Sequence, residues 1–308
     1  MNIVVIGVGG VGGYFGGKLA LAGYSVTFMA RGKTLEAIKN NGLQVKSING
    51  DFHIHPKVSN NYECIRKGNL VLLCVKSWQI EDIAVQMKPF LSDHTVVLPL
   101  QNGADNAERL GRILNPQNLV GGLCRIVSKI ESPGVINHFS YEPEIVFGEI
   151  DHSQSDRLKK MKLVFDKAVI KNRISQDIQR DIWIKFLFIA SISAAGALTR
   201  SVLGLMREDP FIRNMLLETA AEIVTIGQRL GVHINENDRK KCFELIDRLD
   251  YGTTMSLQRD MMEGRPSELE QFNGFIVTMG DKFDIETPIN DFIYFTLRPM
   301  ELKARQRR

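Results

Sequence analysis

The sequence predicts an α/β Rossmann-type N-terminal domain with a parallel sheet, followed by an all-α C-terminal domain. The chain has 308 residues, which suggests two domains at roughly 150 residues each. Short apolar runs alternate with helical patterns as far as about residue 130, as in βαβ units. From about Gln176 the pattern is helical alone. We therefore place the boundary in residues 171–175 and expect domains at 1–175 and 176–308.

Five apolar runs are expected to form the strands: Ile3–Ile6, Ser25–Met29, Leu70–Val75, Thr95–Leu98 and Asn118–Val120. They are mostly continuous rather than alternating, as expected when both faces of a sheet are covered. Pro99 should end the fourth run, because proline cannot donate to a sheet ladder. Gly23 is a plausible stop for the first helix.

Local signals also predict helices in the second domain. Asp181 is expected to cap a helix that runs through Ser193. Asp209 followed by proline indicates an N-cap and a proline in the first turn, with the helix running toward Leu230. Residues 267–270 fit a capping box before a helix to about Met279. The basic residues 303–308 are expected to be a solvated, frayed end.

Composition and charge exclude several classes of protein. Charged residues make up 24% and hydrophobic residues 44% of the chain, which excludes disorder and small disulfide scaffolds. A formal net charge of +4 is too small to indicate a nucleic-acid partner. The four cysteines lack CxxC spacing and are interpreted as buried residues in a reducing compartment.

We expect a cytoplasmic protein without a membrane partner. The N-terminus has no basic segment of the signal-peptide type. The most apolar later run, Phe186–Leu198, is shorter than the about 20 residues that span a bilayer. It is therefore interpreted as a buried helix. A homodimer is compatible with the sequence.

Glycine is unevenly distributed, with seven of the 26 glycines in the first 17 residues. Gly7-Val8-Gly9-Gly10-Val11-Gly12 fits GxGxxG directly after a predicted strand and at the start of a helix. The first glycine permits the turn, the second lets a pyrophosphate approach, and the third permits close helix packing. We predict a dinucleotide site, with a packing role alone as the alternative. Gly16 and Gly17 are assigned to helix packing.

The end of the second predicted strand indicates which nucleotide binds. NAD sites usually carry an acid about 20 residues past the motif, but here no acid occurs before Glu36. Arg31 follows the strand instead, and a guanidinium suits a 2′-phosphate. Lys33 adds positive charge. We predict NADP, with a solvated loop arginine as the alternative.

Further motifs follow in a fixed order. They are Cys74–Gln79, Gln101–Gly103, Gly121-Gly122 with Ser132–Gly134, Trp183-x-Lys185, Ser256-x-x-x-Asp260 with Gly264–Glu268, and Asn273-Gly274. Together with the glycine turn and Arg31 they resemble the ketopantoate (2-dehydropantoate) 2-reductase family over nearly the whole chain. The order of the motifs carries the resemblance, since each motif alone is weak.

The resemblance implies NADPH-dependent reduction of ketopantoate to pantoate, on the route to pantothenate. Lys185 would be the general acid that protonates the carbonyl oxygen, which a lysine ammonium can do. Its position in an otherwise apolar helical stretch also favours a function, with a snorkelling lysine as the alternative. The partner would be a small 2-oxo acid, held in the cleft between the domains.

The resemblance implies the remaining site residues as well. Lys76 and Asn102 follow strand ends, where open α/β sheets bind ligands, and would lie near the nicotinamide ribose and the substrate. Ser256 would bind the substrate carboxylate, and Glu268 would contact the cofactor. Each residue also has an alternative interpretation. Lys76 could be a solvated loop lysine, and Asn102 could simply form an Asn-Gly turn. Ser256 could cap or solvate a helix, and Glu268 could be an acid favoured in the first turn of a helix.

One departure from the family limits the substrate assignment. The family has Lys with Asn at i+4 and i+8, along one helical face; here these positions hold Lys185, Ile189 and Ser193. Ile189 cannot hydrogen-bond, and Ser193, kept as a substrate-binding residue, is shorter than Asn. A net hydrogen bond contributes about 0.5–1.5 kcal/mol. Ketopantoate remains the predicted substrate, with a reductase of another 2-oxo acid or a non-catalytic NADPH sensor as alternatives.

No metal site is expected. His53 and His55 would share one face of a strand, but no third ligand is evident nearby. No Ser-His-Asp or Cys-His signature appears either, so the predicted chemistry depends on the dinucleotide and Lys185.

Overall fold

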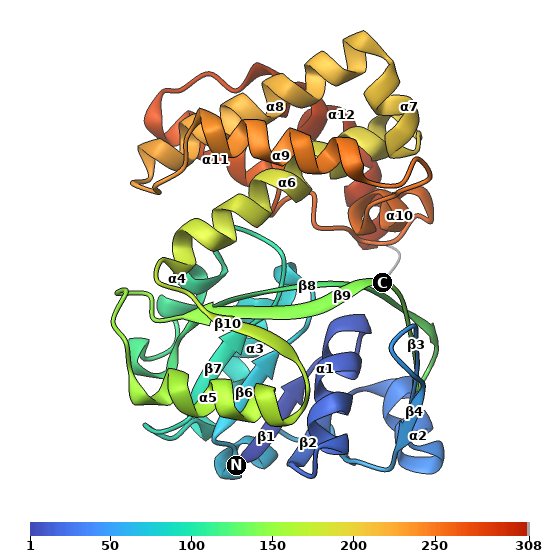
Figure 1. Ribbon diagram of the computed structural model, residues 1–308, viewed down its shortest axis with the longest axis vertical. Helices are drawn as coiled ribbons and strands as arrows, with labels where there is room; N and C mark the ends of the chain where they lie inside the picture. The colour runs from blue at the N-terminus through green and yellow to red at the C-terminus, as the bar shows by residue number, and fades with distance from the viewer. Residues whose placement is uncertain (307–308) are drawn as a thin grey trace. The chain divides into compact units, whose positions relative to one another are not determined.

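The computed structural model describes residues 1–306, and the chain divides into two units, Met1–Ile178 and Gln179 onward (Figure 1). Within the described residues, the first unit holds all the strands and the second unit holds helices. The division falls at residue 178, just beyond the segment 171–175, whose first four residues form a strand.

The first unit contains two sheets and their helices. Its elements are β1 (Asn2–Ile6), α1 (Gly10–Leu21), β2 (Ser25–Met29), α2 (Gly32–Asn41), β3 (Leu43–Ser47), β4 (Phe52–Ile54), β5 (Lys57–Ser59), η1 (Tyr62–Lys67), β6 (Leu70–Leu73), η2 (Ser77–Gln79), α3 (Ile80–Met87), η3 (Lys88–Phe90), β7 (Val96–Pro99), α4 (Asn106–Gly111), η4 (Pro116–Asn118), β8 (Gly121–Ser132), β9 (Val135–Gly148), α5 (Asp156–Lys167) and β10 (Lys171–Ile174). The elements labelled η are short 3₁₀ helices.

The first sheet has the strand order β5-β2-β1-β6-β7, and all its pairs are parallel. The parallel sheet is therefore confirmed, and four of the five expected strands match it within two residues. The strand expected at Asn118–Val120 is wrong. Asn115 caps the 3₁₀ helix η4 there, so only Leu119 pairs with the sheet, through one bridge to Val97.

Alternate residues of the central strand enter two separate cores. Ile3 and Val5 of β1 pack in a cluster with α1, whereas Val4 and Ile6 pack in a cluster with α3 and α4. Apolar side chains on both faces explain why the strands are continuous apolar runs.

The second sheet has the order β10-β9-β3-β4, with β8 paired to β9 in a long hairpin. The sequence patterns did not indicate it. Helix α1 packs against strands of both sheets: a methyl group on Gly16 would lie 2.6 Å from Phe28 of β2, and one on Gly13 would lie 2.5 Å from Ile136 of β9. The absence of a side chain at Gly13 and at Gly16 therefore permits the close approach of both sheets.

The second unit contains seven helices within the described residues: α6 (Ile178–Thr199), α7 (Leu203–Glu208), α8 (Pro210–Arg229), α9 (Glu236–Arg248), α10 (Ser256–Met262), α11 (Asn273–Phe283) and α12 (Pro288–Gln306). Helix α6 begins before Asp181 and continues beyond Ser193, so it is longer than expected. Its Trp183 packs edge-to-face on Phe186 in an aromatic core. Among residues 1–306, only α6 is long and apolar enough to cross a membrane, and 67% of its most apolar window is buried in protein.

Two expectations for the C-terminal region are wrong. The helix expected after residues 267–270 begins later, at Asn273. The Ser267 hydroxyl accepts from the Leu269 N–H at 3.2 Å, as a cap would, but it also donates to Glu301 of α12 at 2.6 Å, and residues 269–272 form turns. The chain end is not frayed through residue 306: α12 extends to Gln306, Ala304 is buried, and Arg305 pairs with Glu301 at 2.8 Å. Arg307 and Arg308 lie outside the described residues.

The N-cap of α8 gives a test of this unit. Asp209 accepts hydrogen bonds from the backbone N–H groups of Phe211 and Ile212, each at 2.9 Å. We expect Asp209→Ala to lower the free energy of unfolding by about 1 kcal/mol, measured by urea denaturation monitored by circular dichroism. Asp250→Ala, at an exposed position, is the matched control, and an equal loss in both variants would contradict the capping role.

Candidate functional site

The glycine turn lies at the carboxyl end of β1, where the strand order reverses between β2 and β6. Gly7 has a φ of +97°, and a methyl group on it would lie 2.8 Å from the backbone of Cys74. A methyl on Gly10 would lie 2.5 Å from the Ser128 hydroxyl, and one on Gly12 would collide with the Gly7 carbonyl. These three positions are therefore closed by protein atoms.

Gly9 is different, because a methyl group there would meet no atom within 4 Å. The open side of Gly9 is where a phosphate could approach the backbone at the start of α1. Val8 is buried and Val11 packs against the same core, so these two residues could bind a ligand only through their backbones. Burial raises the pKa of the Cys74 thiol well above its ordinary value, which keeps this neighbour of the turn uncharged.

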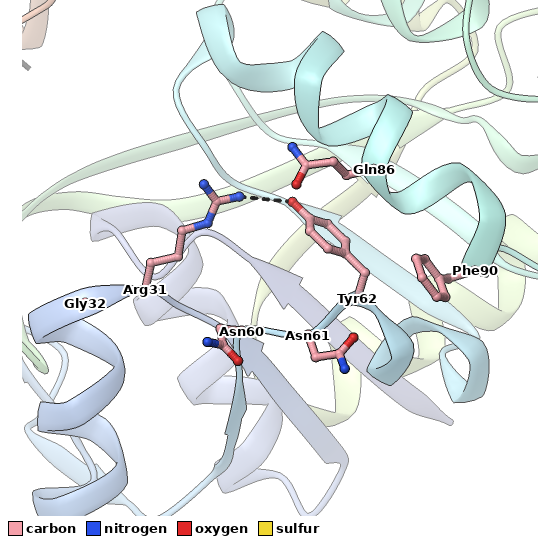
Figure 2. Close-up of a pocket in the computed structure, with 7 residues that line it drawn as sticks. All are labelled: Arg31, Gly32, Asn60, Asn61, Tyr62, Gln86 and Phe90. Carbon is pink, nitrogen blue, oxygen red and sulfur yellow. Dashed lines mark hydrogen bonds between the residues drawn. The ribbon is translucent and has the colours of Figure 1, made fainter.

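A pocket of about 600 Å³ lies at the carboxyl ends of β2 and β5. It is lined by Arg31, Gly32, Asn60, Asn61, Tyr62, Gln86 and Phe90. The exposed Arg31 is the residue before α2, and its Nη2 donates to the Tyr62 hydroxyl at 3.2 Å. Figure 2 shows Arg31, Tyr62 and Gln86 directed toward one another across the pocket. This pocket could hold an anionic group beside an aromatic ring.

Sequence reasoning identified Arg31 but missed the opposite side of this pocket. Tyr62 stacks on Phe90, with ring centroids 6.4 Å apart and an angle of 19° between the planes. Asn60 and Asn61 follow β5, which has only three residues and was not expected as a strand. The two asparagines directly after Ser59 are the one local signal that could have indicated this strand end.

Lys76 and Asn102 lie in loops after β6 and β7, and a hydrogen-bond network joins the two loops. The Ser77 hydroxyl donates to the Asn102 carbonyl at 2.8 Å. Asn106 donates to the same carbonyl at 3.1 Å, and Arg109 donates to the Ser77 carbonyl at 3.1 Å. The structure therefore brings these two predicted residues into one coupled segment of the first unit.

The same segment contains a buried side-chain amide, Gln101, which stands in a motif noted from the sequence but was given no role there. Gln101 is 7% exposed, and neither its nitrogen nor its oxygen has a hydrogen-bond partner within residues 1–306. Leaving a buried polar group unsatisfied costs about 1–3 kcal/mol. A ligand with both a donor and an acceptor would satisfy it, so the segment fits an amide-bearing cofactor.

Helix α6 carries Lys185, Ile189 and Ser193 along one face. Lys185 is partly buried, and Ile189 is 7% exposed. Ser193 is buried, and its hydroxyl donates to the Ile189 carbonyl within the helix. Because that proton is already donated, Ser193 could meet a substrate only as a hydrogen-bond acceptor, and its substrate-binding role stays a prediction.

Helix α10 and the turn after it carry the other predicted residues of this unit. Ser256 is the first residue of α10 and is partly exposed. Glu268 is buried and lies outside any helix, in the turn before α11. The expected alternative, an acid favoured by a helix first turn, therefore does not apply to Glu268.

The histidines give no metal site. The His53 and His55 rings lie 4.8 Å apart, and His53 contacts the Asn41 carbonyl at 2.6 Å. No group of three His, Cys, Asp or Glu residues suited to a metal ion occurs in the part of the chain that is described.

A glycine turn between the first strand and first helix of a Rossmann-type sheet is typical of the class of dinucleotide-binding proteins. Two family models then match the chain: "Ketopantoate reductase PanE/ApbA" over residues 3–152, and its C-terminal counterpart over residues 177–301. The chain belongs to the ketopantoate reductase family and is an oxidoreductase.

Relatives agree with this family. An uncharacterized oxidoreductase of Bacillus subtilis, YkpB, is 29% identical over 301 residues, with 98% of this chain and 99% of the relative covered. A 2-dehydropantoate 2-reductase of Mesorhizobium japonicum is 26% identical, with 98% of each chain covered. The crystal structure of a PanE/ApbA family ketopantoate reductase from Ralstonia eutropha has a TM-score of 0.91 at 25% identity, covering 99% of this chain and 100% of the other.

The open side of Gly9 leads to a prediction. Gly9→Ala should fold normally, because a methyl group meets no protein atom there and the backbone φ of −90° suits alanine. It should nevertheless weaken binding of nicotinamide dinucleotides by about tenfold or more, measured by fluorescence titration. Gly252→Ala, at another open glycine, is the control. Unchanged affinity in Gly9→Ala would contradict the phosphate site.

Proposed function

We propose that the protein reduces the keto group of a 2-oxo acid with NADPH, and that the substrate is ketopantoate, which becomes pantoate. The observation that carries the proposal is that the open glycine turn and the Arg31 pocket stand at the carboxyl ends of neighbouring parallel strands, β1 and β2. One dinucleotide with a 2′-phosphate would use both. The family membership supports the reaction.

Residues of the first unit would hold the cofactor. The backbone at residues 7–12 faces the pyrophosphate, and Arg31 pairs with the 2′-phosphate through a charge-assisted hydrogen bond. Lys76 and Asn102 serve the ribose and the nicotinamide end, with Asn102 also near the substrate. Glu268 supplies a further cofactor contact from the second unit. When bound, NADPH supplies the hydride.

Lys185 supplies the proton in this proposal. Its ammonium group donates to the substrate carbonyl oxygen as negative charge develops there, so the product leaves as a 2-hydroxy acid. Partial burial of Lys185 in an apolar helix strengthens its interaction with that charge, because little water screens it. Ser256 binds the substrate carboxylate.

A second candidate is the reduction of a 2-oxo acid other than ketopantoate. The specific observation in its favour is the α6 face, where Ile189 is apolar and the Ser193 hydroxyl donates to the helix backbone. Positions 189 and 193 therefore offer no side-chain hydrogen-bond donor to a hydroxylated substrate. The non-catalytic sensor is disfavoured by the presence of Lys185, Ser256 and Glu268.

We further propose a cytoplasmic location, without nucleic-acid or membrane partners. All four cysteines are free thiols, two of them buried, which suits a reducing compartment. A homodimer is compatible with this function.

The cofactor preference can be tested at Arg31. We expect Arg31→Asp to weaken NADPH binding by about 100-fold, because it removes a charge-assisted hydrogen bond and adds a like charge, and to change NADH binding much less. Titration by fluorescence measures both dissociation constants. Lys160→Asp, on the exposed face of α5, controls for net charge. Equal losses for the two cofactors would refute the NADP preference.

The reaction can be tested at Lys185. We expect Lys185→Ala to lower kcat by about 100- to 10,000-fold, the usual contribution of a general acid, while NADPH affinity stays the same. NADPH oxidation is followed by absorbance with ketopantoate and a panel of other 2-oxo acids. Lys241→Ala, at an exposed position on α9, is the control. Activity confined to another acid overturns the ketopantoate assignment, and no activity at all favours the sensor.

A further inference from the structure

Arg259 of α10 is a partly buried cation that makes no direct ion pair with an acid among residues 1–306, although Asp260 lies next to it in the chain. Its neighbour Asp260 pairs with Arg265 at 2.8 Å. Other partly or fully buried arginines have partners that explain them: Arg109 pairs with an acid, and Arg207 donates to three carbonyls at the end of α9. Burial lowers the pKa of the Arg259 guanidinium, and the charge of the neighbouring Asp260 offsets only part of that effect.

The contacts of Arg259 leave one edge of its guanidinium open. Both of its hydrogen bonds use Nη1, which donates to the Thr254 carbonyl at 2.5 Å and to the Thr254 hydroxyl at 3.1 Å. The N–H groups of Nε and Nη2 therefore have no partner within the described chain. These two parallel donors match the two oxygens of a carboxylate.

Ser256 lies one helical turn before Arg259, so the two side chains share a face of α10. The Ser256 hydroxyl makes no hydrogen bond to any residue from 1 to 306. This face is only partly exposed. A carboxylate bound to the open edge of Arg259 would therefore have a further hydroxyl donor beside it.

Packing in the second unit places α10 along the functional face of α6. A methyl group on Gly196 would lie 2.6 Å from the Gln258 side-chain oxygen, and the Gln258 nitrogen donates to the Ser201 carbonyl at 2.8 Å. Gly196 lies eleven residues beyond Lys185, which is close to three full turns, so both occupy the same side of α6. Helix α10 thus packs on the side of α6 that carries the proposed proton donor, about 16 Å further along that helix.

We propose that Arg259, together with Ser256, binds the carboxylate of the 2-oxo acid substrate through the open Nε–Nη2 edge of its guanidinium. This inference rests on the proposed function and adds to it the residue that recognises the substrate's charge. It would also explain how the substrate is recognised although positions 189 and 193 hold isoleucine and serine instead of the asparagines of the family pattern. Recognition of the acid then comes from α10, while Lys185 faces the keto group.

Three variants of the full-length enzyme test the proposal by NADPH oxidation. We expect Arg259→Met to raise KM for the 2-oxo acid by about 10- to 100-fold, the usual effect of losing a hydrogen-bonded charge, with kcat changed less than about threefold. Arg259→Lys keeps the charge without the paired donors and should lose about tenfold or less. Arg248→Met, at an exposed arginine on α9, should match the wild type.

The substrate's own charge provides a second readout. Wild type should prefer the 2-oxo acid to the corresponding uncharged 2-oxo amide, and Arg259→Met should lose that preference, whereas a purely structural role would weaken both substrates alike. An unchanged KM with the preference retained overturns the proposal. Melting temperature and NADPH binding show whether Arg259→Met is folded. If it is not, the same comparison of acid and amide substrates is made with Arg259→Lys, and its result decides whether the proposal stands.

Failure of the proposed function would be seen separately, as a wild-type enzyme that reduces no 2-oxo acid. The Arg259 site is then tested with oxamate, an unreactive carboxylate, by calorimetry in the presence of NADPH. At least tenfold weaker binding to Arg259→Met than to wild type supports the site. Equal affinity, or no binding to the wild type, overturns it.

Discussion

The first unit depends on how closely α1 packs between two sheets. Gly16 faces β2 and Gly13 faces β9, and a methyl group on either would lie less than 3 Å from a core side chain. Each sheet therefore fixes one side of the helix. Since the helix cannot shift, its N-terminal turn is held at the carboxyl end of β1, and Gly9 alone of the turn's glycines remains open. The glycine-rich N-terminus thus serves packing at most positions and ligand approach at one.

The same sheet edge organises the rest of the cofactor side. Strands β6 and β7 end beside the glycine turn, and their loops are joined through the Asn102 carbonyl, which accepts from Ser77 and Asn106. Arg109, itself paired with Glu81, holds the first of these loops. Such a network fixes loop geometry before a ligand arrives, and less conformational entropy is then lost on binding. The carboxyl end of the sheet is accordingly a rigid surface rather than a set of independent loops.

Local patterns in the sequence were sufficient for the parallel sheet, the glycine turn and Arg31, because each depends on residues close together in the chain. They were insufficient wherever a distant partner decides the structure. Ser267 has the signature of a helix cap and its hydroxyl accepts from the Leu269 N–H, yet it also donates to Glu301, 34 residues away, and the helix begins only at Asn273. The second sheet depends on a parallel pair between β3 and β9 and on a hairpin with irregular register, which weakens the alternation that would reveal it. The sequence predicts the helix face on which Ser193 lies, but it does not predict that the Ser193 hydroxyl donates to the helix backbone.

In the proposed reaction, the composition of helix α6 explains why another element would recognise the substrate's charge. The helix is apolar on most of its surface and largely buried, so an amide at position 189 would need a constant partner, since an unsatisfied buried amide is costly. Isoleucine removes that requirement and leaves Lys185 as the polar group of that face. The carboxylate of a 2-oxo acid still needs a positive partner, because a charge leaving water is not stabilised by apolar contacts. Arg259 stands on the helix that packs against Gly196, and it can supply that partner without a polar side chain in the core of α6.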